Sequence, residues 1–111
     1  MTTTAPTDFE ARRDKALAAM RQALGTPAGD GSVSLFIDHH LDELPPEWWR
    51  QRLGVARPEP AAVLALLQCR SSWGENDLQV FDFTLPDDVT NYLVSVRFDV
   101  GGQVESLSME S

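Results

Sequence analysis

The dipeptide Gly101–Gly102 constrains this chain more than any other feature of its sequence. It separates two stretches in which apolar and polar residues alternate, and a two-residue glycine turn between such stretches is typical of a β-hairpin. The turn also predicts the strand register, because it pairs residues at equal distances on its two sides. The predicted pairs are Val100 with Gln103, Phe98 with Glu105, Val96 with Leu107, and Val94 with Met109.

Two further stretches alternate with period two, which is the spacing of a half-buried strand. In residues 78–85 the alternation places three apolar residues on one face, namely Phe81, Phe83 and Leu85. Residues 32–41 have the same period. This period predicts a strand in which His39 faces the core and His40 faces solvent beside Asp38.

Helices are predicted before and between these strands. The first begins in a capping box at Thr7 and ends at Gly25, which supplies a left-handed stop. A short helix is expected to begin near Pro46 and end at Gly54, and a third to run over residues 60–73. The chain is therefore predicted to be α+β, with a sheet of about four mainly antiparallel strands and helices packed on one face.

Length and charge bound the class of protein. The 111 residues are expected to form a flexible leader over residues 1–6 and a single domain over residues 7–111. A net charge of −8, from 17 acids and 9 bases, argues against binding to nucleic acid or to anionic membranes. No stretch approaches the roughly 20 apolar residues of a membrane span. The lone Cys69 and the lack of a signal-peptide core predict a cytoplasmic location.

The two adjacent histidines carry the candidate metal site of the sequence. If residues 32–41 form a strand, Asp38, His40 and Asp42 lie on one face at alternate positions. Carboxylate and imidazole groups are ligands of divalent ions, so this set could hold one. A metal-binding protein or a small metal-dependent enzyme is therefore one alternative for the function.

Other catalytic chemistry has little support in the sequence. The chain has no G-x-S-x-G, H-E-x-x-H, P-loop or dinucleotide-binding pattern. Cys69 is expected inside a buried helix, where a thiol is unreactive. An enzyme is therefore not favoured, and no cofactor is predicted.

Two groups of residues fit recognition of a protein better. The first is a short run on the second predicted helix, composed of Trp48, Trp49, Arg50 and Arg52. Tryptophan and arginine are favoured interface anchors, and one of the two tryptophans is expected to point inward while the other is partly open. The second is a charged group on the outer face of the predicted sheet, composed of Asp82, Arg97 and Asp99.

Two segments of the chain, HHLDELPPEWW and VFDFTLPDDVTNYLVSVRFDVGGQVESLSMES, resemble small bacterial proteins of an uncharacterised family, a domain of unknown function. The shared pattern has a His-His-Leu-acid-Glu-Leu run at 39–44, a Phe-Asp-aromatic strand at 81–83, and a Tyr-Leu strand ending in Arg-Phe-Asp at 92–99. The resemblance covers about residues 32–111 and implies no catalytic residue. In size and charge the chain is also similar to immunity proteins of toxin systems, which bind and block one cognate toxin.

These observations together predict a cytoplasmic, non-enzymatic binding module whose acidic surface meets a protein partner. A basic partner fits the charge of the chain, and an immunity-type inhibitor of a basic toxin is one concrete version. Two alternatives stay open. One is the metal protein that uses Asp38, His40 and Asp42. The other is a homo-oligomeric structural protein, such as a homodimer joined through the open sheet face or an edge strand.

Overall fold

The computed structural model describes residues 8–111, and the predicted leader and the cap at Thr7 lie outside this range. The predicted α+β class, with a four-stranded antiparallel sheet, is confirmed. No helix within the described range is long and apolar enough to cross a membrane. The elements in chain order are α1 (Asp8–Ala23), α2 (Pro27–Asp30), α3 (Val33–Glu43), α4 (Pro46–Leu53), α5 (Pro60–Leu64), β1 (Gln68–Trp73), the 3-10 turn η1 (Glu75–Asp77), β2 (Val80–Thr84), β3 (Leu93–Phe98) and β4 (Val104–Glu110).

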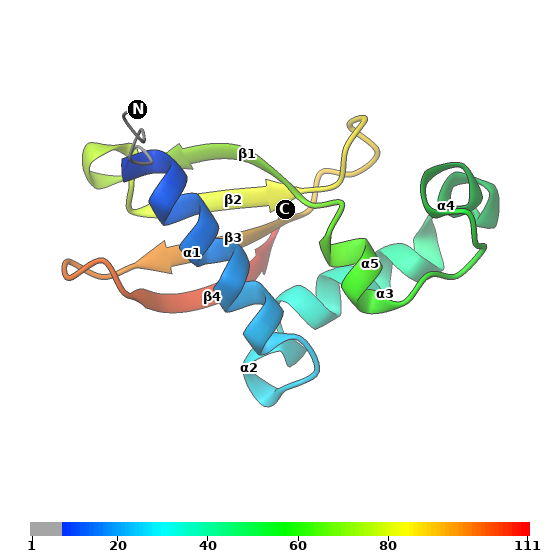
Figure 1. Ribbon diagram of the computed structural model, residues 1–111, viewed down its shortest axis with the longest axis horizontal. Helices are drawn as coiled ribbons and strands as arrows, with labels where there is room; N and C mark the ends of the chain where they lie inside the picture. The colour runs from blue at the N-terminus through cyan, green and yellow to red at the C-terminus, as the bar shows by residue number, and fades with distance from the viewer. Residues whose placement is uncertain (1–7) are drawn as a thin grey trace, which may run out of the picture.

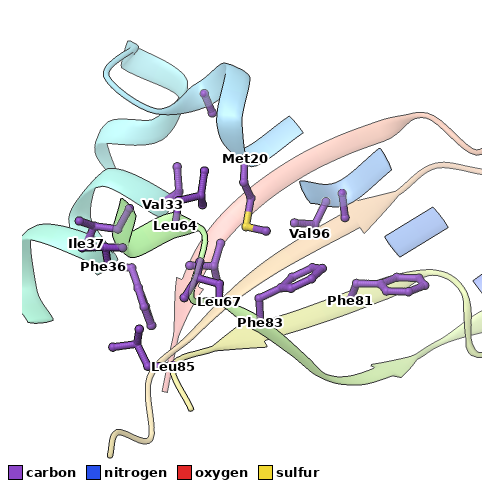
Figure 2. Close-up of a cluster of buried hydrophobic side chains, with 14 of the residues drawn as sticks. Met20, Val33, Phe36, Ile37, Leu64, Leu67, Phe81, Phe83, Leu85 and Val96 are labelled. Atoms are coloured by element: carbon purple, nitrogen blue, oxygen red, sulfur yellow. The ribbon is translucent and has the colours of Figure 1, made fainter. Parts of the chain in front are cut away.

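The sheet is a meander in which each strand pairs with the next one along the chain. Figure 1 shows α1 crossing one face of the sheet, while α3, α4 and α5 lie toward one end of it. We call the face under α1 the inner face and the opposite one the outer face. The inner face contributes buried side chains from its two central strands, namely Phe81, Phe83, Val94, Val96 and Phe98. Figure 2 shows Met20 reaching from α1 toward Val96 and Phe83, so this helix closes the core.

The strand predicted over residues 32–41 was wrong, because this segment forms the helix α3. Its buried residues recur at helical spacing, which makes one apolar stripe, and they are Val33, Phe36, Ile37, His40 and Leu41. The predicted strand face and the helical stripe share Val33, Ile37 and Leu41, so these three residues do not distinguish a strand from a helix. The remaining residues do. Phe36 is fully buried and Leu35 is 47% exposed, which fits the helix and contradicts the strand.

The helix predicted over residues 60–73 is also too long. It ends at Leu64, and the fourth strand of the sheet is β1 rather than the segment at 32–41. Most side chains of β1 are exposed or half-buried, because it is an edge strand with one partner. An edge strand of this kind lacks the regular apolar alternation that marks a strand in a sequence.

The predicted hairpin is confirmed in two of its four strand pairs, and its register near the turn and the turn itself were wrong. Val94 pairs with Met109 and Val96 with Leu107, as predicted. The register then shifts beyond Arg97, so Phe98 pairs with Val104 instead of Glu105, and Val100 is fully exposed. The cause is Asp99, whose Oδ1 accepts hydrogen bonds from the backbone N–H groups of Gly101 (2.9 Å) and Gln103 (3.0 Å). These bonds build a longer turn over 99–103 in place of the two-residue one.

Both predicted helix stops are confirmed. Gly54 follows α4 with a φ of 78°, and the N–H of Gly54 donates to the carbonyl of Arg50. Gly25 lies just beyond α1 with a φ of 79°. This left-handed conformation costs glycine little, which explains why these positions end their helices.

The helical stripe of α3 can be tested with two neighbouring residues. We expect Phe36→Ala to lower the free energy of unfolding by about 3–5 kcal/mol, because it leaves a cavity in the core. Leu35→Ala, one residue away, is expected to cost no more than about 0.5 kcal/mol, because its side chain is half-exposed. Urea denaturation of the two variants measures both values. A large decrease in the free energy of unfolding for Leu35→Ala, with a small decrease for Phe36→Ala, would contradict the helix and support the strand predicted over residues 32–41.

Candidate functional site

The two tryptophans of α4 differ in burial, as the sequence suggested. Trp49 is fully buried and Trp48 is half-buried, and their rings lie perpendicular with centroids 4.8 Å apart. The indole Nε1 of Trp49 is buried without an oxygen or nitrogen acceptor among the described residues. Trp49 is therefore a core residue, and the helix presents no fully open aromatic ring.

The arginines of α4 are engaged within the molecule. Arg50 pairs with Glu47 one turn earlier at 3.3 Å. Arg52 pairs with Asp87 of the β2–β3 loop, and its guanidinium lies 5.5 Å from the centroid of the Trp48 ring. The Arg52–Asp87 pair holds α4 against the loop, and the engagement of both arginines makes α4 a weaker candidate for a docking surface than the sequence indicated.

The structure does not bring Asp38, His40 and Asp42 together as metal ligands. On a helix Asp38 and Asp42 lie on one face and His40, two residues from each, points away from it, so His40 is buried while both aspartates are exposed. Asp42 instead pairs with Arg57 at 3.1 Å. Within residues 8–111 no group of three or more histidine, cysteine or acidic side chains could hold a metal ion.

The predicted orientations of the two histidines were reversed, and the buried one is His40. Its Nδ1 lies 2.6 Å from the carbonyl of Phe36, which can only accept, so Nδ1 carries the proton. Its Nε2 lies 2.7 Å from the hydroxyl of Thr90, which therefore donates to it. Burial lowers the pKa of His40, helped by the nearby His39, against the opposing effects of the Phe36 bond and of Glu43. His40 is thus a neutral link between α3 and the β2–β3 loop.

The outer face of the sheet is arranged in rows that run across the strands. The central row takes one residue from each strand, and its members are Ser71, Asp82, Ser95 and Ser108. The row beside it is composed of Trp73, Val80, Arg97 and Ser106. On the other side of the central row, Leu93 pairs with Glu110. Short serine side chains leave a hollow of about 400 Å³ between these groups, which we call the trough.

Asp82 organises the centre of the outer face. Asp82 is 7% exposed although it lies on the outer face, opposite to the face that α1 crosses. Oδ1 accepts a hydrogen bond from Ser95 Oγ at 2.6 Å, and Oδ2 accepts bonds from Trp73 Nε1 at 3.0 Å and Ser71 Oγ at 3.4 Å. These donors meet the requirement that a buried charge be hydrogen-bonded.

Trp73 and Arg97 form the raised wall of the trough. Trp73 is 47% exposed, and its ring is held by the bond from its indole N–H to Asp82. The guanidinium of Arg97 lies 5.8 Å from the centroid of that ring, within the range of a cation–π contact. Of the predicted charged network, Asp82 and Arg97 therefore lie on one face. Asp99 does not join them, because its carboxylate caps the β3–β4 turn.

The position of Trp73 on the outer face of the sheet was not predicted from the sequence. The residue was assigned to the end of a helix, whereas it is the last residue of β1. The signal that could have found it is weak, because the edge strand contains a bulge between Cys69 and Ser71. This bulge breaks the period-two pattern that would otherwise place the outward-facing residues.

Cys69 lies on β1 rather than in the buried helix predicted for it, and its side chain is half-buried. Burial raises the pKa of its thiol, and the nearby Arg13 opposes that effect. A thiol with a raised pKa holds little thiolate, which is the nucleophilic form. Nucleophilic chemistry at Cys69 therefore has no support in its environment.

Comparison with protein-family models, curated proteins and solved structures finds no match to this chain. The resemblance of residues 32–111 to small bacterial proteins of an uncharacterised family stays a prediction.

The neutral state of His40 predicts how stability depends on pH. Because the pKa of His40 is lowered in the folded protein, the unfolded chain binds more protons below its ordinary pKa of 6.5. The free energy of unfolding is expected to be unaffected by His40 above 6.5 and to fall as the pH drops from there toward the folded pKa. Urea denaturation between about pH 7.5 and about pH 5 measures this slope.

Two variants separate His40 from other titrating groups. His40→Asn places an amide nitrogen where Nδ1 lies and cannot titrate, so we expect the slope below 6.5 to decrease. His39→Asn is the matched control and is expected to decrease the slope less than His40→Asn does, because His39 contributes only part of the lowering of the His40 pKa and burial contributes the largest part. An equal slope in the wild type and in His40→Asn would contradict the assignment.

Proposed function

We propose that this protein is a non-enzymatic, acidic protein-binding module that docks its partner on the outer face of the sheet. The observation that carries the proposal is Trp73, a half-exposed aromatic ring fixed on an uncovered sheet face. Tryptophan, tyrosine and arginine are enriched among the few residues that supply most of the binding energy at protein interfaces. Trp73 and Arg97 bring both residue types to one wall of the trough.

The hydrogen bond to Asp82 favours Trp73 as an anchor. A side chain that is ordered before binding loses less conformational entropy when the partner arrives. The 3.0 Å hydrogen bond from Trp73 Nε1 to the buried Asp82 carboxylate orders the ring before any partner binds. The α4 tryptophans lack this combination, because Trp49 is buried and Trp48 packs against it.

Charge supports a partner with a basic surface. The net charge of −8 attracts such a surface over distances up to about a Debye length, roughly 8 Å at physiological salt. This long-range attraction raises the rate of encounter rather than the strength of the final contact. An immunity-type inhibitor of a basic toxin in the bacterial cytoplasm is the concrete version that we favour. The lone Cys69 supports the cytoplasm as the compartment.

The docking face can be tested by site-specific photo-crosslinking in the source cells. A photo-reactive amino acid is placed at Ser106, which is exposed on the outer face, and as a matched control at Asp30, which is exposed on α2. We expect one discrete adduct with a basic protein from position 106 and none from position 30. Equal labelling from both positions, or none from position 106, would contradict the proposal. An adduct of twice the mass of the chain would assign the face to a homodimer instead.

The partner identified in this way allows the anchor itself to be measured. Trp73→Ala is expected to weaken the complex by about 2 kcal/mol or more, which is the loss typical of a buried aromatic anchor. Arg50→Ala, on α4 and away from the trough, is expected to change the affinity by less than about 0.5 kcal/mol. Isothermal titration calorimetry gives both values. Unchanged affinity for Trp73→Ala would remove the anchor from the outer face.

A further inference from the structure

Arg97 is half-buried and has no acceptor within residues 8–111, whereas the other two basic residues without one, Arg21 and Arg70, are exposed. Four arginines pair with carboxylates, and they are Arg13, Arg50, Arg52 and Arg57. Arg12 donates to the carbonyl of Leu78 at 3.0 Å. Arg97 is half-buried, yet within residues 8–111 its guanidinium makes no hydrogen bond and no ion pair.

The neighbouring carboxylates do not fill this gap. Asp82 accepts bonds from Trp73, Ser95 and Ser71, and it forms no ion pair with Arg97. Glu110 lies on the far side of the trough, because it pairs with Leu93 while Arg97 is four residues further along β3. At about 3.3 Å per residue this separates the two positions by about 13 Å along the strand. The guanidinium therefore offers free donors to whatever enters the trough.

We infer that Arg97 receives an aspartate or glutamate side chain of the docked protein, a conclusion that rests on the proposed function. The planar guanidinium fork matches the two oxygens of a carboxylate and can bind both at once. The Trp73 ring, 5.8 Å away, restricts the guanidinium from the side. Ser106 and Ser108 line the same trough and add hydroxyl donors beside it.

An acidic contact of this kind is compatible with a basic partner. The attraction between the two proteins depends on their summed charges and is screened over about a Debye length. The contact at Arg97 depends on one charge pair at hydrogen-bond distance, where geometry decides the strength. The partner is therefore expected to present one carboxylate within an otherwise basic surface.

Acetate is the probe that isolates this contact, since it carries the carboxylate alone. The full chain is titrated with sodium acetate and, at equal ionic strength, with sodium chloride, while NMR follows the Arg97 Nε and Trp73 Nε1 resonances. We expect saturable shifts of both resonances with acetate and none with chloride. Shifts that do not saturate, or that chloride reproduces, overturn the inference.

Three variants define the site. Arg97→Gln is expected to reduce the affinity for acetate by at least about tenfold, because it removes the charged fork. Arg97→Lys keeps the charge and loses the fork, so an intermediate affinity is expected. Arg70→Gln is the matched control, since Arg70 is exposed on β1 and likewise has no acceptor within residues 8–111. An equal effect of Arg70→Gln and Arg97→Gln would show a general charge effect and overturn the inference.

Three further results identify the ligand chemistry and separate this inference from the proposed function. A phosphate titration that saturates about tenfold more tightly than acetate would assign Arg97 to a phosphoryl group and overturn the carboxylate. A crosslinked partner that binds Arg97→Gln as tightly as the wild type would overturn the inference and leave the proposed function intact. Acetate binding without any protein adduct at position 106 would leave Arg97 as a carboxylate site, but it would overturn the proposed function and with it the docked protein as the source of that carboxylate.

Discussion

The whole arrangement depends on the burial of one face of the sheet. The inner face carries large apolar side chains such as Phe81, Phe83 and Phe98, which must be removed from water for the sheet to be stable. The helices meet this requirement from one side, with Met20 of α1 at the centre of the contact (Figure 2). Because α1 crosses the inner face and α3, α4 and α5 lie toward one end of the sheet, the outer face is left open (Figure 1). The surface available for recognition is therefore a consequence of how the core is closed.

An open face normally carries side chains that water can solvate, and this one departs from that rule at Asp82. Its carboxylate is buried under Trp73 and is compensated by hydrogen bonds from Trp73, Ser71 and Ser95. This local network replaces the covering helix and orders the side chains around the trough. Arg97 is not part of this network, so within residues 8–111 the N–H donors of its guanidinium have no acceptor.

Local signals in the sequence predicted those parts of the fold that depend on neighbouring residues. The hairpin register at Val94 and Val96 and the helix stop at Gly54 are of this kind. The segment at 32–41 failed because its apolar residues satisfy a strand period and a helix period at once. Choosing between them requires the burial of Phe36, which depends on what packs against it. Edge strand β1 failed because one partner and a bulge leave it little apolar pattern.

In the candidate site, too, the sequence predicted the features that depend on neighbouring residues and not those that depend on long-range contacts. Alternation along β2 and β3 placed Asp82 and Arg97 on one face, and the structure agrees. Trp73 joins them through strand pairing that its own neighbours in the sequence do not indicate. His40 is hydrogen-bonded to Thr90, which is 50 residues away in the sequence, so local sequence patterns do not predict this contact either. The parts of the site that could not be predicted are those that depend on contacts between residues far apart in the sequence.

The β2–β3 loop has a property that follows from its two attachments. Arg52 holds Asp87 from α4, and His40 holds Thr90 from α3, so the loop is bound to two helices within four residues. Surface loops ordinarily tolerate insertions and deletions. A change of length here would shift both attachment points and displace α4 relative to the sheet. The length of this loop is therefore coupled to the position of two helices at once, and insertions or deletions are expected to be tolerated poorly there.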